Sequence, residues 1–384
     1  MKTPFSSILD QIPESGIRTF FDIVSESDDV ISLGVGEPDF LTPWTIREAA
    51  ISALQLGYTN YTSNYGLMEF RSAVSTHILQ EYNVIYDSAK EIIATNGVSE
   101  AADIVFRAIL NPGDEVILPQ PIYVCYEPLI RLTGATVIPL DTSDTQFVPM
   151  PEMIEEKITP KTKAIVLCYP SNPTGQSISK AVLEDISEIA ARHDLWVISD
   201  EIYSDLTFDQ EFVSFASLDK MRERTILLSG FSKNFAMTGW RIGYVCGPEE
   251  LIKRACKIHQ YSALCASIVA QKAAIEALSH GKKEVKKMRD SYRHRKRLFV
   301  NGLQKIGLPV IEPQGAFYCF PSIKQTGLSS QVFAEQLLKD EKVAVVPGHV
   351  FGKGGEGHVR CCFATEKQLL EEALIRIERF VRSL

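Results

Sequence analysis

The sequence predicts an α/β protein whose larger part is a mainly parallel sheet flanked by helices. Short apolar runs rich in β-branched residues alternate along the middle of the chain with helix-compatible stretches such as 99–110 and 181–193. The apolar runs lie at 92–94, 115–118, 164–167, 196–198, 226–228 and 243–245. Continuous apolar runs are typical of strands buried on both faces, and their alternation with helices indicates βαβ units. Because such sheets bind ligands at the carboxyl ends of their strands, we expect the functional residues in the loops that follow these runs.

The chain length indicates more than one domain, because 384 residues exceed one comfortable hydrophobic core. A charged, helix-compatible stretch at 281–306 is the predicted bridge into a smaller α+β domain, with its lysines and arginines on a solvated face. Strand candidates in that domain are 317–320, 343–346 and 358–361. We therefore predict a large domain at 46–281 and a small domain formed by 1–45 together with 282–384.

Composition narrows the class of protein without naming a ligand. The chain is 45% hydrophobic and 23% charged, as in ordinary globular proteins, and its net charge of −8 argues against a general nucleic-acid binder. No apolar run approaches the roughly 20 residues of a membrane span, and the first ten residues lack a signal-peptide core, so we expect a cytoplasmic protein. The 8 cysteines form no CxxC pair and predict buried small hydrophobes with no metal site.

One lysine, Lys233, follows the apolar run 225–228 in the phrase SGFSKNFAMTGWRIGY, which ends at Tyr244. A charge at a buried strand end is costly, and burial lowers a lysine pKa until the neutral amine can form a Schiff base with an aldehyde. A lysine that reaches solvent from the strand end is the simpler alternative. The phrase resembles the cofactor-lysine motif of fold-type I pyridoxal 5′-phosphate (PLP) enzymes, specifically the class I and II aminotransferases. That resemblance implies a seven-stranded, mainly parallel sheet in the large domain and PLP as the cofactor.

A carboxylate follows the apolar run 196–198 at Asp200. Such a carboxylate can pair with a protonated pyridine nitrogen, although a helix N-cap is an alternative role for Asp200. In the resembling family this aspartate is the partner of the pyridine nitrogen, and Tyr203 matches the tyrosine that donates to the phenolic oxygen. The resemblance therefore implies that Lys233, Asp200 and Tyr203 are the catalytic residues.

A phosphate site is expected where 95–100 joins a strand to a helix, because helix N-terminal amides attract anions. In the resembling family the amides here hold the cofactor phosphate, which implies roles for Gly97, Val98 and Ser99. Ser99 is equally a candidate N-cap, and both roles can coexist.

Further cofactor contacts are implied downstream of the lysine motif and in a separate loop. Arg241 offers a fixed charge with two-pronged geometry for the phosphate. Ser229 and Ser232 are candidate hydroxyl donors, although this chain carries Gly230 where some members of the family carry serine. Tyr123 matches the aromatic residue that stacks on the cofactor ring.

The substrate side of the predicted site draws on three motifs. Asn172, in the Asn-Pro-Thr-Gly turn 171–175, matches the asparagine that bonds the phenolic oxygen and reaches the substrate carboxylate. Gly36, in the segment GVGEPDF, matches the glycine that lets the backbone approach this carboxylate. Arg360 aligns with the arginine that grips the carboxylate, for which a planar guanidinium is well suited.

Two residues are implied to act at the edge of the site. Tyr61 matches the tyrosine that reaches across a dimer to the neighbouring phosphate, so the resemblance implies a homodimer with shared active sites. The segment that contains Ile17 resembles the N-terminal segment of the γ subgroup, which includes PatA-type, aspartate and aromatic aminotransferases. Ile17 would be an apolar plug over the substrate. The resemblance runs from about Gly16 to Arg360.

The resemblance implies an aminotransferase that moves an amino group from an aspartate, aromatic or related L-amino acid to a 2-oxo acid, with 2-oxoglutarate as the expected acceptor and ping-pong kinetics. A PLP-dependent β carbon–sulfur lyase uses the same lysine, aspartate and arginine and is the main alternative. A PLP-sensing transcription regulator would need a DNA-binding domain before Gly36, and a dinucleotide enzyme would need GxGxxG after a first strand. Arg18 and Arg107 could meet a distal substrate carboxylate, but structural ion pairs are the favoured interpretation.

Overall fold

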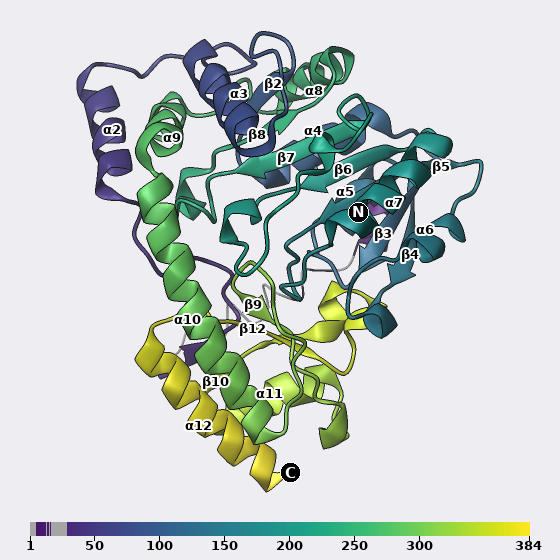
Figure 1. Cartoon of the computed structure of the whole chain (residues 1–384), viewed down its shortest axis with the longest axis vertical. Helices are drawn as coiled ribbons and strands as arrows, with labels where there is room; N and C mark the ends of the chain where they lie inside the picture. Colours follow the sequence, from purple (N-terminus) through teal and green to yellow (C-terminus); the bar gives the residue numbers. More distant parts are fainter. Residues whose placement is uncertain (1–4, 13, 15, 17–28) are drawn as a thin grey trace.

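The computed structural model describes residues 5–12, 14, 16 and 29–384. Its centre is one sheet with the strand order β2-β8-β7-β6-β5-β3-β4 (Figure 1). The strands are β2 (Ile92–Thr95), β3 (Glu115–Gln120), β4 (Thr136–Asp141), β5 (Thr162–Cys168), β6 (Trp196–Asp200), β7 (Thr225–Gly230) and β8 (Gly243–Cys246). β8 runs opposite to the other six strands, so its pairings with β2 and β7 are antiparallel and the remaining pairings are parallel. The predicted α/β fold with a mainly parallel seven-stranded sheet is therefore confirmed.

Helices cover both faces of this sheet, because successive strand residues point to opposite sides. In β5, Val166 packs in the core under α4 and α8, whereas Ile165 and Leu167 pack in the core under α7. The helices of this part are α2 (Trp44–Gln55), α3 (Met68–Tyr82), α4 (Val98–Ile109), α5 (Tyr126–Leu132), α6 (Pro151–Glu155), α7 (Lys180–Arg192), α8 (Glu249–Ser262) and α9 (Ile268–His280). Strands that are buried on both sides explain the continuous apolar runs in the sequence.

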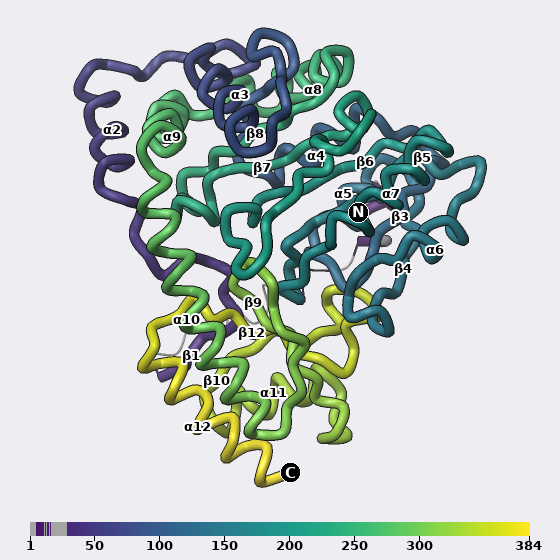
Figure 2. Tube along the Cα trace, in the orientation of Figure 1, coloured from purple at the N-terminus to yellow at the C-terminus, as the bar shows by residue number. Residues whose placement is uncertain are grey.

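A long helix, α10 (Lys282–Ile306), runs from this upper part into a lower part (Figure 1). The lower part has an antiparallel sheet in the order β11-β12-β9. It also has a parallel pair of strands, β1 and β10, and these two strands lie side by side in Figure 2. Its elements are β1 (Ile31–Ser32), β9 (Tyr318–Cys319), β10 (Val343–Ala344), β11 (Val346–Pro347), β12 (Val359–Cys362), α11 (Ser330–Glu341) and α12 (Lys367–Ser383). We propose that 1–45 and 282–384 form the small domain, with 46–281 as the large one.

Most cationic residues of α10 fit the expectation of a solvated face, but Arg295 and Lys296 do not: the Arg295 side chain is 14% exposed and lies 2.7 Å from Asp39. Lys287 pairs with Glu284 on the surface, at 2.8 Å. Lys296 is only 2% exposed and lies 2.8 Å from Glu312, which offsets the cost of burying its charge. Within the part of the chain that the structure describes, no helix is both long and apolar enough to cross a membrane.

Candidate active site

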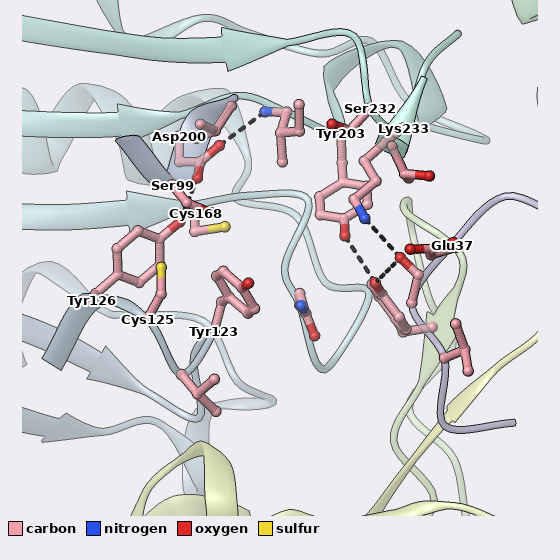
Figure 3. Close-up of a pocket in the computed structure, with 18 of the residues that line it drawn as sticks. Glu37, Ser99, Tyr123, Cys125, Tyr126, Cys168, Asp200, Tyr203, Ser232 and Lys233 are labelled. Atoms are coloured by element: carbon pink, nitrogen blue, oxygen red, sulfur yellow. Dashed lines mark hydrogen bonds between the residues drawn. The ribbon is translucent and has the colours of Figure 1, made fainter. Parts of the chain in front are cut away.

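A cavity of about 810 Å³ lies where the carboxyl ends of β5 and β6 and the loop after β7 face β9, β12 and the segment 35–37 (Figure 3). A volume of this size is typical of small-molecule sites. Most of the predicted site residues line its wall: Gly36, Val98, Ser99, Tyr123, Asn172, Asp200, Tyr203, Ser232, Lys233, Arg241 and Arg360. Residues that are far apart in the sequence therefore meet around one space, as expected for strand-end loops.

Lys233 extends into the cavity from the turn after β7, and its Nζ donates a hydrogen bond to the Gly36 carbonyl at 2.7 Å (Figure 3). Desolvation lowers the pKa of this amine to about 8, although the nearby Glu37 carboxylate favours the charged form. The amine is therefore much closer to neutrality at physiological pH than a solvent-exposed lysine, whose pKa is about 10.4. A neutral amine is the form that attacks an aldehyde.

Asp200 ends β6 with its carboxylate buried in the cavity wall. The Tyr126 hydroxyl donates to Oδ2, and the Ile202 amide donates to Oδ1 at 3.1 Å. Burial raises the pKa of Asp200 to about 6, and the hydrogen bond from Tyr126 opposes that rise. Such a buried carboxylate favours a positively charged group opposite it, as a protonated pyridine nitrogen would be.

Tyr203 presents its hydroxyl to the same space, beside Lys233 (Figure 3). This hydroxyl lies 2.9 Å from the hydroxyl of Tyr318, a residue of β9. The Tyr318 hydroxyl in turn lies 3.5 Å from the Gly36 carbonyl, the acceptor of the Lys233 bond. A Cβ at position 36 would overlap this hydroxyl, so only glycine fits the close approach.

The turn before α4 forms an anion cradle together with Arg241. Gly97 caps the helix with a φ of +80°, and a Cβ there would lie 2.5 Å from Nη2 of Arg241. Nη1 of Arg241 donates to the Thr238 carbonyl at 3.0 Å, which fixes the guanidinium beside the helix N-terminus. Ser99 lies in the first turn of α4, so its interpretation as the N-cap is wrong, because Gly97 holds that position.

A half-buried carboxylate that the sequence did not single out stabilises this turn. Glu100 accepts hydrogen bonds from the Asn96 backbone amide at 2.5 Å and from the Asn96 side chain at 2.9 Å. Its other oxygen lies 2.9 Å from Nδ1 of His259, a fully buried residue of α8. The strand-to-helix turn is therefore held rigid from the side that faces away from the cavity.

Arg360 is 2% exposed, and hydrogen bonds orient its guanidinium. Nη1 donates to Oδ1 of Asn172 at 2.9 Å, and Nη2 donates to the Gly34 carbonyl at 2.5 Å. The guanidinium carbon lies 4.6 Å from the ring centroid of Tyr318 and 5.1 Å from that of Phe351. Its Nε has no hydrogen-bond partner among the described residues, which leaves a donor for an anionic ligand.

Other predicted residues lie apart from the cavity wall. The Ser229 hydroxyl lies 3.5 Å from the Glu201 carbonyl and does not line the cavity. Tyr61 is 83% exposed on the molecular surface, and Ile17 lies outside the described residues. Arg107 forms an ion pair with Asp103 on α4 at 2.9 Å, as the favoured interpretation expected.

The sequence did not single out two tyrosines of the wall, Tyr126 and Tyr318. Tyr126 starts α5 three residues after Tyr123, and their rings meet edge to face at 6.0 Å. That spacing was the one available signal, since Tyr123 lies in the loop that follows β3 and Tyr126 begins the next helix. Tyr318 lay within a strand candidate, and only its pairing opposite Cys362 brings it to the strand that carries Arg360.

The donor set fits PLP. One cavity contains a lysine of lowered pKa, a buried carboxylate without a cationic hydrogen-bond partner among the described residues, and a phenol. A helix N-terminus with an arginine beside it could hold the phosphate, and the missing Gly97 Cβ lets the Arg241 guanidinium approach this helix end. These are the partners that the aldehyde, pyridine nitrogen, phenolic oxygen and phosphate of PLP need.

Comparison with known proteins agrees with this geometry. The family model "Aminotransferase class I and II" matches residues 28–377. YugH of Bacillus subtilis (strain 168) is 50% identical over 382 residues, which cover 99% of each chain. The aspartate aminotransferase of Pyrococcus abyssi is 44% identical over 381 residues, which cover 98% of each chain.

Among solved structures, the aromatic aminotransferase from Pyrococcus horikoshii OT3 superimposes with a TM-score of 0.91 at 42% identity, covering 95% of this chain and 99% of that chain. Nothing in these comparisons favours the carbon–sulfur lyase, and the family is one that uses PLP. The resemblance inferred from the sequence is confirmed: the chain belongs to the class I and II aminotransferases and is an enzyme of amino-group transfer.

Proposed function

We propose that this enzyme holds PLP on Lys233 and moves an amino group from an L-amino acid to a 2-oxo acid by a ping-pong mechanism. The observation that carries the proposal is the meeting, in one cavity, of the Lys233 amine with the buried Asp200 carboxylate and the preset Arg360 guanidinium. When bound, PLP supplies an aldehyde for the lysine and a ring that withdraws electrons from the reacting carbon.

The large domain holds the cofactor in this proposal. Asp200 keeps the pyridine nitrogen protonated, because a buried carboxylate favours a cation opposite it. Tyr203 and Asn172 donate to the phenolic oxygen, and Tyr123 lies against the ring. The phosphate is held by the amides of Gly97, Val98 and Ser99, the hydroxyl of Ser232 and the guanidinium of Arg241. Ser232 lines the cavity, whereas Ser229 is proposed only as a support behind it.

Lys233 is the proposed acid and base of the reaction. Its Nζ takes the α-proton from the amino acid and later returns a proton, so one group serves both halves of the ping-pong cycle. A pKa of about 8 suits this role, because efficient proton transfer needs a pKa near the working pH. The Gly36 carbonyl, 2.7 Å from Nζ, orients the amine.

The small domain selects the substrate through its α-carboxylate. Arg360 forms the two-pronged contact, with Asn172 and the backbone at Gly36 beside it. Ile17, from the N-terminal segment, is the proposed apolar cover. We propose aspartate, an aromatic amino acid or a related donor, since relatives of this chain are named for these substrates, with 2-oxoglutarate as acceptor.

A homodimer with shared sites is the proposed working unit. Tyr61 is exposed, as are Leu56, Tyr58 and Met68 near it in the sequence and Tyr261 and Leu264 around the end of α8. The Asn64 side chain donates to the Leu264 carbonyl at 2.7 Å, which joins these two segments into one surface. Exposed apolar patches are typical of protein interfaces, and a partner there would bring its own Tyr61 toward this cavity.

We also propose a cytoplasmic location. All eight cysteines are free in the structure, and a cysteine set without disulfides is typical of a reducing compartment.

The test of the proposed reaction is a single-turnover incubation of the purified, PLP-loaded enzyme with a panel of L-amino acids. Stoichiometric formation of pyridoxamine phosphate with release of a 2-oxo acid is the expected result. Release of pyruvate and ammonia from cystathionine without pyridoxamine phosphate would instead identify the lyase.

A further inference from the structure

We propose that Tyr318 is a positioning residue that serves both halves of the site: its hydroxyl orients the Tyr203 phenol and its ring supports the Arg360 guanidinium. This inference rests on the proposed function, because it concerns the donor at the cofactor oxygen and the substrate-binding arginine. No motif in the sequence assigned Tyr318 a role, and its contacts alone carry the argument.

The position of the Tyr318 hydroxyl is tightly determined. Tyr318 is 1% exposed, and its hydroxyl lies 2.9 Å from that of Tyr203 and 3.5 Å from the Gly36 carbonyl. The Tyr203 and Tyr318 rings meet edge to face, with centroids 5.8 Å apart. Since a Cβ at Gly36 would overlap the hydroxyl, the backbone itself makes room for this group.

The hydrogen count assigns a direction to this pair. Each phenol has one hydrogen to donate and can accept two. Once Tyr203 donates to the phenolic oxygen of the cofactor, it can only accept from Tyr318. The Tyr318 hydroxyl can donate to the Gly36 carbonyl at 3.5 Å or to the Tyr203 hydroxyl at 2.9 Å, and the shorter distance favours Tyr203 as its acceptor. A phenol that accepts a hydrogen bond becomes a stronger donor, because hydrogen bonds in a chain polarise one another.

The ring of Tyr318 has a separate contact. The guanidinium carbon of Arg360 lies 4.6 Å from its centroid, within the range of a cation–π interaction. Phe351 lies on the guanidinium at 5.1 Å, so two aromatic rings restrain it. β9 and β12 are paired with Tyr318 opposite Cys362, which places Tyr318 next to the strand of Arg360. One residue therefore links the substrate arginine to the cofactor tyrosine.

The hydroxyl is tested by Tyr318→Phe, which keeps the ring, and by following the visible absorption of the bound cofactor as a function of pH. A hydrogen bond to the deprotonated phenolic oxygen of the cofactor lowers the pKa of the cofactor. A weaker donor at Tyr203 should therefore raise the midpoint of the pH-dependent change in cofactor absorption. The expected rise is about 0.5 to 1 pH unit, the value of one ordinary hydrogen bond, and smaller than the rise in Tyr203→Phe.

Tyr292→Phe is the matched control. Tyr292 lies fully buried in the same hydrophobic cluster as Tyr203 and Tyr318, and its hydroxyl has no hydrogen-bond partner among the described residues. This control should leave the midpoint unchanged, whereas a purely structural role for Tyr318 predicts that both variants behave alike. Thermal unfolding of both variants separates loss of stability from loss of the hydrogen bond.

The ring is tested by comparing Tyr318→Leu with Tyr318→Phe. The leucine variant should raise the KM for the amino donor about 2- to 30-fold above that of the phenylalanine variant, because only the former loses the cation–π contact with Arg360. Equal KM values would overturn this half of the inference.

The outcomes distinguish the inference from the proposed function. An unchanged midpoint in Tyr318→Phe, together with a shifted midpoint in Tyr203→Phe, would overturn the role of the hydroxyl and leave the aminotransferase proposal intact. A wild-type protein that takes up no PLP would overturn the proposed function itself.

Discussion

The two walls of the cavity are built in different ways. The large-domain wall places single functional groups at strand ends, with Asp200 as the last residue of β6 and Lys233 in the turn after β7. The small-domain wall instead positions Arg360 through aromatic contacts and long-range hydrogen bonds, with Tyr318 and Phe351 against the guanidinium. The functional groups of the large-domain wall can therefore be predicted from local sequence motifs. The orientation of Arg360 in the small-domain wall depends on tertiary contacts.

Removing the carboxylate of the large-domain wall should have the largest effect. Loss of a buried charged partner costs about 3–5 kcal/mol, so Asp200→Ala should slow the half-reaction by roughly two to four powers of ten. The rate is measured in single turnover at saturating PLP. Asp103→Ala, which removes a half-buried carboxylate outside the cavity, is the control and should retain the wild-type rate. A half-reaction in Asp200→Ala that stays close to wild type refutes the role.

The lysine of the same wall should show its lowered pKa when the apoenzyme takes up PLP. Only the neutral amine reacts, so the rate should rise with pH up to about 8 and then level off. At pH 8 about half of the amines with this pKa are neutral, against about 0.3% at an ordinary lysine pKa, a difference of about two powers of ten. Visible absorption follows the uptake, with Lys233→Ala as background. A rate that keeps rising tenfold per pH unit to pH 10 would show an ordinary lysine.

A substitution in the small-domain wall should weaken substrate binding without releasing the cofactor. Arg360→Lys keeps the charge but not the two-pronged geometry, so KM for the amino donor should rise about 10- to 150-fold while the cofactor spectrum is unchanged. Arg107→Lys changes a surface ion pair on α4 and is the matched control. Loss of PLP with unchanged substrate affinity would mean that Arg360 belongs to the cofactor wall.

The smallest effect concerns a contact from a second subunit. Tyr61→Phe should weaken PLP retention about tenfold, the value of one hydrogen bond to a charged group. At limiting PLP, equal amounts of Tyr61→Ala and Lys233→Ala chains should regain about a quarter of wild-type activity, because half of the dimers are mixed and each has one intact site. No gain on mixing, or full activity in a dilute monomer, excludes a shared site.

Much of the fold was predictable because buried parallel strands are continuous apolar runs. The exception is β4, where exposed and buried residues alternate around Pro139 at the sheet edge. A strand that is exposed along one side needs no continuous apolar run, so β4 lacks the signal that identified the other six strands, including the buried edge strand β2.

The site was predictable where one motif brings one group to a strand end. Tyr126 and Tyr318 were not, because their roles depend on a partner far along the chain, Asp200 for the first and Tyr203 for the second. Ser229 and Ser232 were indistinguishable in sequence, but Ser229 lies within β7, whereas Ser232 lies in the turn after it and lines the cavity. Contacts between segments that are far apart in the sequence could not be predicted and became visible only in the structure.

The most direct test of the account is chemical labelling of the lysine. Borohydride reduction of the yellow, PLP-loaded enzyme should fix the cofactor to the protein, and peptide mapping should find the label on Lys233 alone. The buried amine beside the Gly36 carbonyl predicts one labelled peptide per chain. A label on any other lysine, or no stable label at all, would contradict the assignment of the active site.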